Sequence, residues 1–242
     1  MAVTYPTRLP PVQVSWLGCI PYDEAWALQQ RLAVARADGR SPDRLLLLEH
    51  PPVYTLGRSA HAENLLLDDE ALAAEGIAVR HVDRGGDITY HGPGQLVGYP
   101  ILDLRAIAAA QGRSYPDLHA YLRALEETLI VVLAGLGIAA RRYPDYTGVW
   151  VDERGEPEKI AAIGVKVSSR GITSHGFALN VAPNLAHFAG IIPCGIAEHG
   201  VTSIAALRGE APALPDLVPI VSEAFAQQFN RRTLFVPAPQ EA

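Results

Sequence analysis

Residues 84–104, RGGDITYHGPGQLVGYPILDL, constrain the fold more than any other part of the chain, because five of these residues are glycines. A packed strand has no use for so many glycines, since glycine loses the most conformational freedom on folding and gives the core no side chain. A backbone that turns sharply and lies close to a ligand does need them. The segment therefore indicates a ligand-binding loop or a glycine-rich hairpin, and the residues alone leave both open.

Composition limits the class of protein. The 242 residues fit one large domain or two small ones, and 49% apolar against 19% charged residues is enough for a substantial core. The net charge is −6 and lysines and arginines form no block, which argues against a nucleic-acid partner. The longest strongly apolar stretch, residues 129–140, is too short to cross a bilayer, and the first residues lack the apolar core of a signal peptide.

The cysteines and the short motifs limit the chemistry. Two cysteines far apart in sequence favour a reducing cytosol over a disulfide scaffold, so we expect a cytoplasmic protein. The sequence contains no CxxC, HExxH or GxxxxGK[ST], so neither a metal site nor a P-loop has local support. We therefore expect no metal and no nucleotide cofactor.

Hydrophobic periodicity predicts an α+β protein with a mixed, mainly antiparallel sheet and helices packed on it. The predicted strands are residues 12–17, 44–49, 53–56, 77–82, 95–102, 139–143, 148–151, 159–167 and 172–181, and the predicted helices are 23–38, 68–75, 115–136 and 216–229. Residues 211–219 contain three prolines and are predicted to be a linker. We expect a main domain at 1–210 and a C-terminal linker and helix at 211–242, packed on the same domain.

Two of these strands carry small residues on one face. In 159–167 that face holds Ala162 and Gly164, and in 172–181 it holds Gly176 and Ala178. Such faces leave room above the sheet for an extended apolar chain or for the backbone of a closely packed helix. Composition alone favours the helix.

Cys194 is the candidate nucleophile, because it lies between Pro193 and Gly195 in a predicted loop. A loop thiol needs a nearby cation or imidazole to react near neutral pH, and Lys159, His91 and His175 are candidates. The alternative is a purely structural cysteine, an interpretation that suits Cys19.

Four motifs in order, RGGDITYHGPGQLVGYPILDL, KIAAIG, HGFALNV and IIPCGI, resemble the lipoyl(octanoyl) transferases, a family related in fold to biotin and lipoate protein ligases. The resemblance implies that Cys194 carries an acyl thioester and that Lys159 assists it. It also implies a substrate site, and the residues that match it are Arg84, Gly85, Gly86, Asp87, Ile88, Thr89, Tyr90, His91, Ala162, Ile163, Gly164, Gly176, Phe177 and Ala178.

The activity that the resemblance implies is transfer of octanoyl from octanoyl-acyl carrier protein to a lysine of a lipoyl domain, through a cysteine thioester. The acceptors would be lipoyl domains of 2-oxoacid dehydrogenase complexes and the glycine cleavage H protein, with no nucleic acid or membrane as partner. Arg141 and Arg142 offer a basic patch for docking an acidic carrier. Two alternatives stay open: an ATP-dependent lipoate or biotin ligase of the same fold, and a catalytically dead module that binds the carrier.

Overall fold

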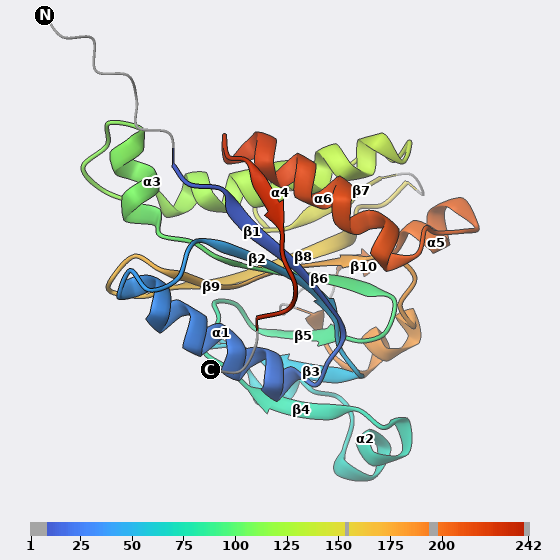
Figure 1. Ribbon diagram of the computed structural model, residues 1–242. Helices are drawn as coiled ribbons and strands as arrows, with labels where there is room; N and C mark the ends of the chain where they lie inside the picture. Colours follow the sequence, from blue (N-terminus) through green and yellow to red (C-terminus); the bar gives the residue numbers. More distant parts are fainter. Residues whose placement is uncertain (1–8, 153–154, 194–197, 240–242) are drawn as a thin grey trace, which may run out of the picture.

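The computed structural model describes residues 9–152, 155–193 and 198–239, and it places helices on both faces of a main β-sheet (Figure 1). Within these residues the main sheet has the order β10–β8–β9–β6–β2–β1–β11, with β7 paired to β8. Its strands are β1 (Val12–Cys19), β2 (Arg44–Glu49), β6 (Gln95–Ile101), β7 (Val149–Val151), β8 (Glu158–Val167), β9 (Thr173–Asn180), β10 (Gly200–Val201) and β11 (Thr233–Phe235). The central pairs β2–β6, β6–β9 and β8–β9 are antiparallel, whereas β1 and β10 pair in parallel with their neighbours.

A smaller sheet, of order β4–β3–β5, lies beneath the main one. It consists of β3 (Val53–Leu56), β4 (Ala78–His81) and β5 (Ile88–His91). The helices are α1 (Tyr22–Ala37), α2 (Asp69–Glu75), α3 (Leu104–Ala110), α4 (Leu118–Gly135), α5 (Ile204–Arg208) and α6 (Leu214–Gln228), with 3-10 turns η1 (Ala62–Asn64) and η2 (Leu185–Gly190). The mixed α+β class that the sequence predicts is confirmed.

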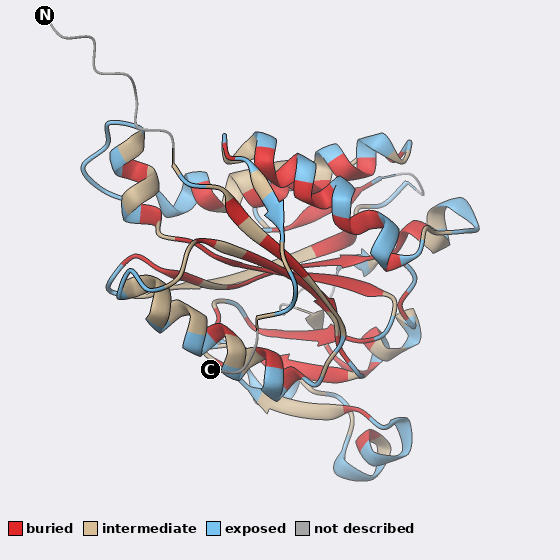
Figure 2. Ribbon diagram, viewed as in Figure 1, coloured by how far each residue is buried: buried red, intermediate tan, exposed pale blue. Residues whose placement is uncertain are grey.

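The central strands of the main sheet are largely buried, as Figure 2 shows, whereas the edge strands β10 and β11 are more exposed. Leu45 and Leu47 of β2 join the cluster formed with α4 and α6, while Leu46 and Leu48 join a second cluster under α1. Successive side chains of a strand point to opposite faces, so an unbroken run of leucines belongs to a strand covered on both sides. The main sheet thus has one face under α4 and α6 and the other facing α1 and the small sheet.

The predicted C-terminal linker is wrong. Helix α6 begins at Leu214, with Pro215 in its first turn and Pro219 inside it. A proline in the first turn removes no helical hydrogen bond, because the amides there have no partner within the helix. Pro219 lies further in and removes one backbone hydrogen bond of the helix. Leu217 and Phe225 are fully buried in the cluster shared with α4, and that burial offsets the missing bond.

Other elements also differ from the predictions. Residues 139–143 form no strand, only an isolated bridge between Arg141 and Trp150. Helix α3 was not predicted, and it begins where Asp103 accepts hydrogen bonds from two backbone amides. The predicted helix 115–136 begins at Leu118, three residues after its expected start.

The glycine-rich segment is not a hairpin. Strand β5 pairs with β3 of the small sheet and β6 pairs with β2 and β9 of the main one, so the segment carries the chain from one sheet to the other. Gly94 makes the crossing with φ +82°, and a Cβ there would lie 2.3 Å from the carbonyl oxygen of Ala182. Only glycine fits this position.

Candidate functional site

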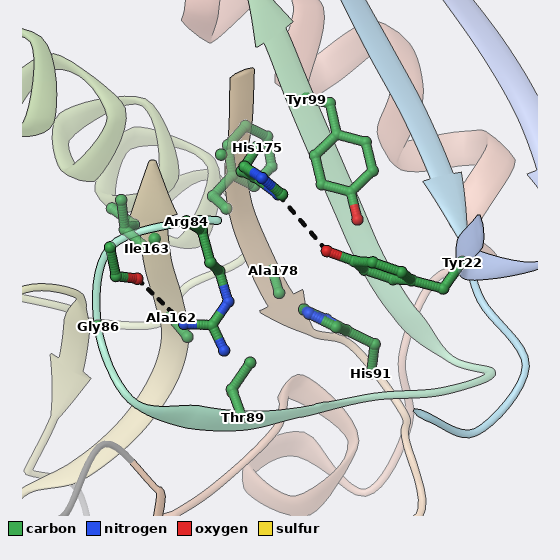
Figure 3. Close-up of a pocket in the computed structure, with 14 residues that line it drawn as sticks. Tyr22, Arg84, Gly86, Thr89, His91, Tyr99, Ala162, Ile163, His175 and Ala178 are labelled. Atoms are coloured by element: carbon green, nitrogen blue, oxygen red, sulfur yellow. Dashed lines mark hydrogen bonds between the residues drawn. The ribbon is translucent and has the colours of Figure 1, made fainter. Parts of the chain in front are cut away.

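A cavity lies between the β8–β9 face, the glycine-rich segment and the start of α1 (Figure 3). Its walls are Tyr22, Arg84, Gly85, Gly86, Thr89, His91, Tyr99, Ala162, Ile163, Gly164, His175, Gly176, Phe177 and Ala178. The structure therefore brings together eleven of the predicted substrate-site residues from three separate motifs.

Small residues create the space. Ala162 pairs with Ala178 and Gly164 with Gly176 across the two strands. Part of this face is covered, because Ala178 packs in the cluster under α1, while the same strands also line the open cavity. An apolar chain in that cavity stays a prediction.

Arg84 forms a buried wall of the cavity. Its guanidinium donates to the Thr55 carbonyl at 2.5 Å, to the Thr55 hydroxyl at 3.0 Å and to the Gly85 carbonyl at 3.0 Å. The Gly85 amide donates to the carbonyl of Val165 at 2.9 Å, which fixes the segment against β8. Arg84 therefore joins the small sheet to the cavity.

His175 has an unusual backbone. Its φ is +56°, a conformation uncommon for any residue with a Cβ. Its amide donates to Gln29 Oε1 at 2.7 Å, and its Nε2 lies 2.7 Å from Asp83 Oδ1. Burial lowers the pKa of His175 despite the opposing effect of Asp83. In Figure 3 its ring points toward Tyr22, whose hydroxyl lies 3.5 Å from Nδ1.

Two more histidines lie at or behind the cavity wall. Burial, reinforced by the neighbouring His50, lowers the pKa of His91 to about 3, although a hydrogen bond with Gln95 opposes the shift. Burial likewise lowers the pKa of His50 to about 4. The His91 ring stacks on Tyr22, with ring centroids 6.1 Å apart. At neutral pH these imidazoles are uncharged, which suits an apolar ligand.

Lys159 lies outside this cavity wall and is 6% exposed. Its ammonium stands 4.8 Å from the centroid of the Trp150 ring, within range of a cation–π interaction. Val201 of β10 pairs with Lys159, and the Thr202 amide donates to the Lys159 carbonyl at 3.0 Å.

Cys194 lies outside the described residues. On its N-terminal side the Ile192 amide donates to the carbonyl of Asn64 at 2.8 Å, and on its C-terminal side the chain returns at β10 beside Lys159. The other cysteine, Cys19, is exposed, and partial burial together with Glu49 raises the pKa of its thiol.

Three predicted site residues face away from the cavity. Asp87 accepts hydrogen bonds from the amides of His61 and Ile88 at 3.1 and 2.7 Å, and so shapes the glycine-rich turn. Ile88 and Tyr90 pack in the core of the small sheet. Their positions follow from strand alternation, since Thr89 and His91 are the residues of β5 that reach the cavity.

The sequence did not single out Tyr22 or Tyr99 as site residues. Tyr99 lies in the glycine-rich segment itself, so an aromatic residue at that position could have been predicted to line the site. Tyr22 lies more than 60 residues earlier in the chain, and only the fold brings it to the cavity.

The predicted basic patch is wrong as well, since its charges are paired. Arg141 forms a salt bridge with Asp152, in which Nε lies 2.5 Å from Oδ2, and Arg142 forms salt bridges with Glu126 and Glu127. Across the residues described, no three His, Cys, Asp or Glu side chains gather as a metal site would require. The same residues include no helix long and apolar enough to span a membrane.

Comparison with known proteins gives consistent results. Residues 21–226 match the family model of the lipoyl protein ligase A/B catalytic domain. An octanoyltransferase of Chloroflexus aggregans is 48% identical over 89% of this chain and 94% of its own length. An octanoyltransferase of Rubrobacter xylanophilus is 55% identical over 77% of this chain and 79% of its own. A bipartite lipoate protein ligase from Thermoplasma acidophilum has a similar fold, with a TM-score of 0.69 at 17% identity over 96% of this chain and 88% of its own.

Proposed function

The chain belongs to the family of lipoyl protein ligase A/B catalytic domains, and from that membership we propose how it works as an octanoyltransferase in protein lipoylation. Octanoyl transfer is its activity, and a protein with a lipoyl domain is its partner. The donor we propose is octanoyl-acyl carrier protein. The acceptors we propose are lipoyl domains of 2-oxoacid dehydrogenase complexes and the glycine cleavage H protein, in the cytoplasm.

The observation that carries the acyl site is the cavity floored by Ala162, Gly164, Gly176 and Ala178. Its floor carries only the methyl groups of the two alanines, so an unbranched acyl chain can lie close to the backbone of β8 and β9. The buried histidines around it are uncharged at neutral pH, and the Arg84 guanidinium is bonded to protein oxygens. An alkyl chain can therefore be buried there without leaving a histidine charge unpaired.

The proposed reaction has two displacements. The Cys194 thiolate attacks the carbonyl carbon of the donor thioester; the enzyme thioester forms and the carrier thiol leaves. The acceptor lysine, as a free amine, then attacks this thioester, an amide forms and the Cys194 thiolate leaves. Both steps use bonds already activated in the donor, so neither needs ATP.

Lys159 is the proposed partner of Cys194. Its ammonium would favour the Cys194 thiolate over the thiol and would give its proton to the departing carrier thiolate. The resulting Lys159 amine would then take the proton that the acceptor lysine loses as the amide forms. In support, the chain that follows the PCG motif returns at β10, where Gly200 pairs with Glu158 and Val201 with Lys159.

Intact mass spectrometry tests this proposal. Wild-type protein incubated with octanoyl-acyl carrier protein and no ATP should gain the mass of one octanoyl group. Cys194→Ala should abolish the adduct and Cys19→Ser should keep it. An adduct that persists in Cys194→Ala would refute the thioester at that residue, and transfer that occurs only with ATP would favour a ligase.

A further inference from the structure

A second cavity continues from the first along the same face of β8 and β9. The floor of the acyl cavity is the pairs Ala162–Ala178 and Gly164–Gly176, and the next pair on that face is Lys166–Ser174. Lys166 and Ser174 line the second cavity, whose other wall includes Trp26, Gln29 and Ala33 of α1. The two cavities are therefore consecutive compartments above one pair of strands.

A polar bridge separates them. Asp83 Oδ1 lies 2.7 Å from His175 Nε2, and Asp83 Oδ2 accepts a hydrogen bond from the Lys166 ammonium. His175 lines the acyl cavity, while Asp83 and Lys166 line the second cavity. We call His175, Asp83 and Lys166 the Asp83 bridge.

The position of the bridge matches the length of the substrate. His175 pairs in register with Val165, three residues beyond Ala162, which is roughly 10 Å along a strand. An extended eight-carbon acyl chain has seven carbon–carbon bonds of about 1.5 Å, so its zigzag spans roughly 9 Å. A chain whose carbonyl lies beside Ala162 would bring its terminal methyl to the level of His175.

We propose that the Asp83 bridge is the end wall that sets the acyl chain length of this enzyme. An octanoyl chain ends against His175, whereas a longer chain can extend only by displacing His175 from Asp83 and entering the second cavity. An alkyl chain offers no hydrogen bond in exchange, so displacement leaves polar groups unpaired. This inference rests on the proposed function, and on an acyl chain whose carbonyl lies beside Ala162 and whose methyl end points toward His175.

Two variants open the wall by different means. His175→Gly removes the imidazole at a backbone conformation that glycine prefers. Asp83→Ala removes the shared acceptor, whose side chain is 36% exposed. Arg170→Ala is the matched control, because Arg170 lines the second cavity but is bonded to Asp38 and Ala37 rather than to the bridge.

The experiment compares kcat/KM for octanoyl-acyl and dodecanoyl-acyl carrier protein. We expect the dodecanoyl-to-octanoyl ratio to rise at least tenfold, about 1.4 kcal/mol, in both wall variants and to stay unchanged in Arg170→Ala. Circular dichroism and thermal melting establish that each variant is folded. A ratio that does not move in either folded wall variant would overturn the proposal.

Calorimetric titration with free octanoate and dodecanoate separates this proposal from the proposed function. The wall variants should gain affinity for dodecanoate relative to octanoate by a similar factor, since the added methylenes find an apolar space. If the wild-type protein transfers no octanoyl but the affinity ratio shifts in the wall variants, the proposed function is refuted and the end-wall proposal is supported. If octanoyl transfer is normal but neither the kcat/KM ratio nor the affinity ratio shifts, only the end-wall proposal is refuted.

Discussion

The carbonyl oxygen of Thr55 accepts a hydrogen bond from Arg84, whose Nη2 lies 2.5 Å away. Thr55 belongs to the small sheet, and Arg84 also lines the acyl cavity, so this contact ties the cavity wall to the small sheet. Arg84 therefore both lines the cavity and supports the structure around it.

Arg84→Ala should accordingly lose stability as well as activity. Arg84 is only 7% exposed, and removing its guanidinium leaves the Thr55 carbonyl without this donor. We expect the free energy of unfolding to fall by about 2–3 kcal/mol, which is typical when a buried hydrogen bond to a charged group is lost. Urea unfolding measures it, with Arg113→Ala, about half-exposed, as the control that should change little. Full stability with impaired kinetics would assign Arg84 to substrate binding alone.

Gly176→Ala should unfold the protein rather than trim the cavity. A Cβ at Gly176 would lie 2.1 Å from the carbonyl oxygen of Gly98, a backbone atom that cannot rotate away. We expect loss of the folded protein or a drop of several kcal/mol in stability, within the range of severe overpacking. Gly135→Ala is the control, because a Cβ there has no neighbour within 4 Å and alanine favours a helix by about 0.5–1 kcal/mol. A stable Gly176→Ala with altered chain-length preference would contradict this.

Acid should destabilise the protein through His50 and His91. Their pKa values in the folded state are about 4 and about 3, against 6.5 for a free imidazole, so the unfolded chain binds these protons first. Stability is therefore full above about pH 6.5 and falls as pH drops toward 4, by roughly 1.4 kcal/mol per pH unit for each histidine.

His91→Gln should remove one of these two contributions and flatten the slope. Urea unfolding at pH 7, 6 and 5 gives the slope directly. His61→Gln, whose side chain is 67% exposed, is the control that should leave the slope as it is. An unchanged slope in a folded His91→Gln protein would mean that His91 is protonated in the native state.

Lys159→Arg should separate the two half-reactions. Arginine keeps a cation at position 159 but does not give up its proton near neutral pH. We expect acyl-enzyme formation to stay within a few-fold of wild type, while transfer to the lipoyl domain slows by about 10²–10⁴, the usual contribution of a general base. Single-turnover intact mass measurements, in a Cys19→Ser background, time the two steps. Equal slowing of both would make Lys159 a positioning residue.

Much of this molecule could be predicted from its sequence, for local reasons. The run Leu45–Leu48 specifies a strand buried on both faces, and Gly76, at φ +64°, follows the last residue of α2, where the predicted helix 68–75 also ends. Strands 159–167 and 172–181 were also predicted close to their observed bounds, and they pair as a hairpin, β8–β9, whose turn includes Gly171 at φ +83°. In each case residues that are close in sequence are enough to specify the local structure.

The remaining features depend on contacts that are distant in sequence. Pro219 signals the end of a helix, and only the packing of α6 on α4 overrules it. Strand β5 pairs with β3 more than 30 residues earlier, which no local pattern specifies. His175 has its positive φ because Gln29, Asp83 and Tyr22 surround it, and these come from three separate parts of the chain.

The pairing of β11 with β1 has a consequence for synthesis. Val12 and Val14 of β1 are fully buried. The Val12 amide donates to the Arg232 carbonyl and the Val236 amide donates to the Val14 carbonyl, so β1 is hydrogen-bonded to β11 along the edge opposite β2. Contacts here join residues as much as 222 positions apart, so on the ribosome β1 must wait on the order of tens of seconds for its last neighbour. Throughout that interval the nascent polypeptide presents an unpaired strand edge, the kind of surface that seeds aggregation. Efficient production should therefore depend on chaperone cover, or on rapid translation, until β11 has emerged.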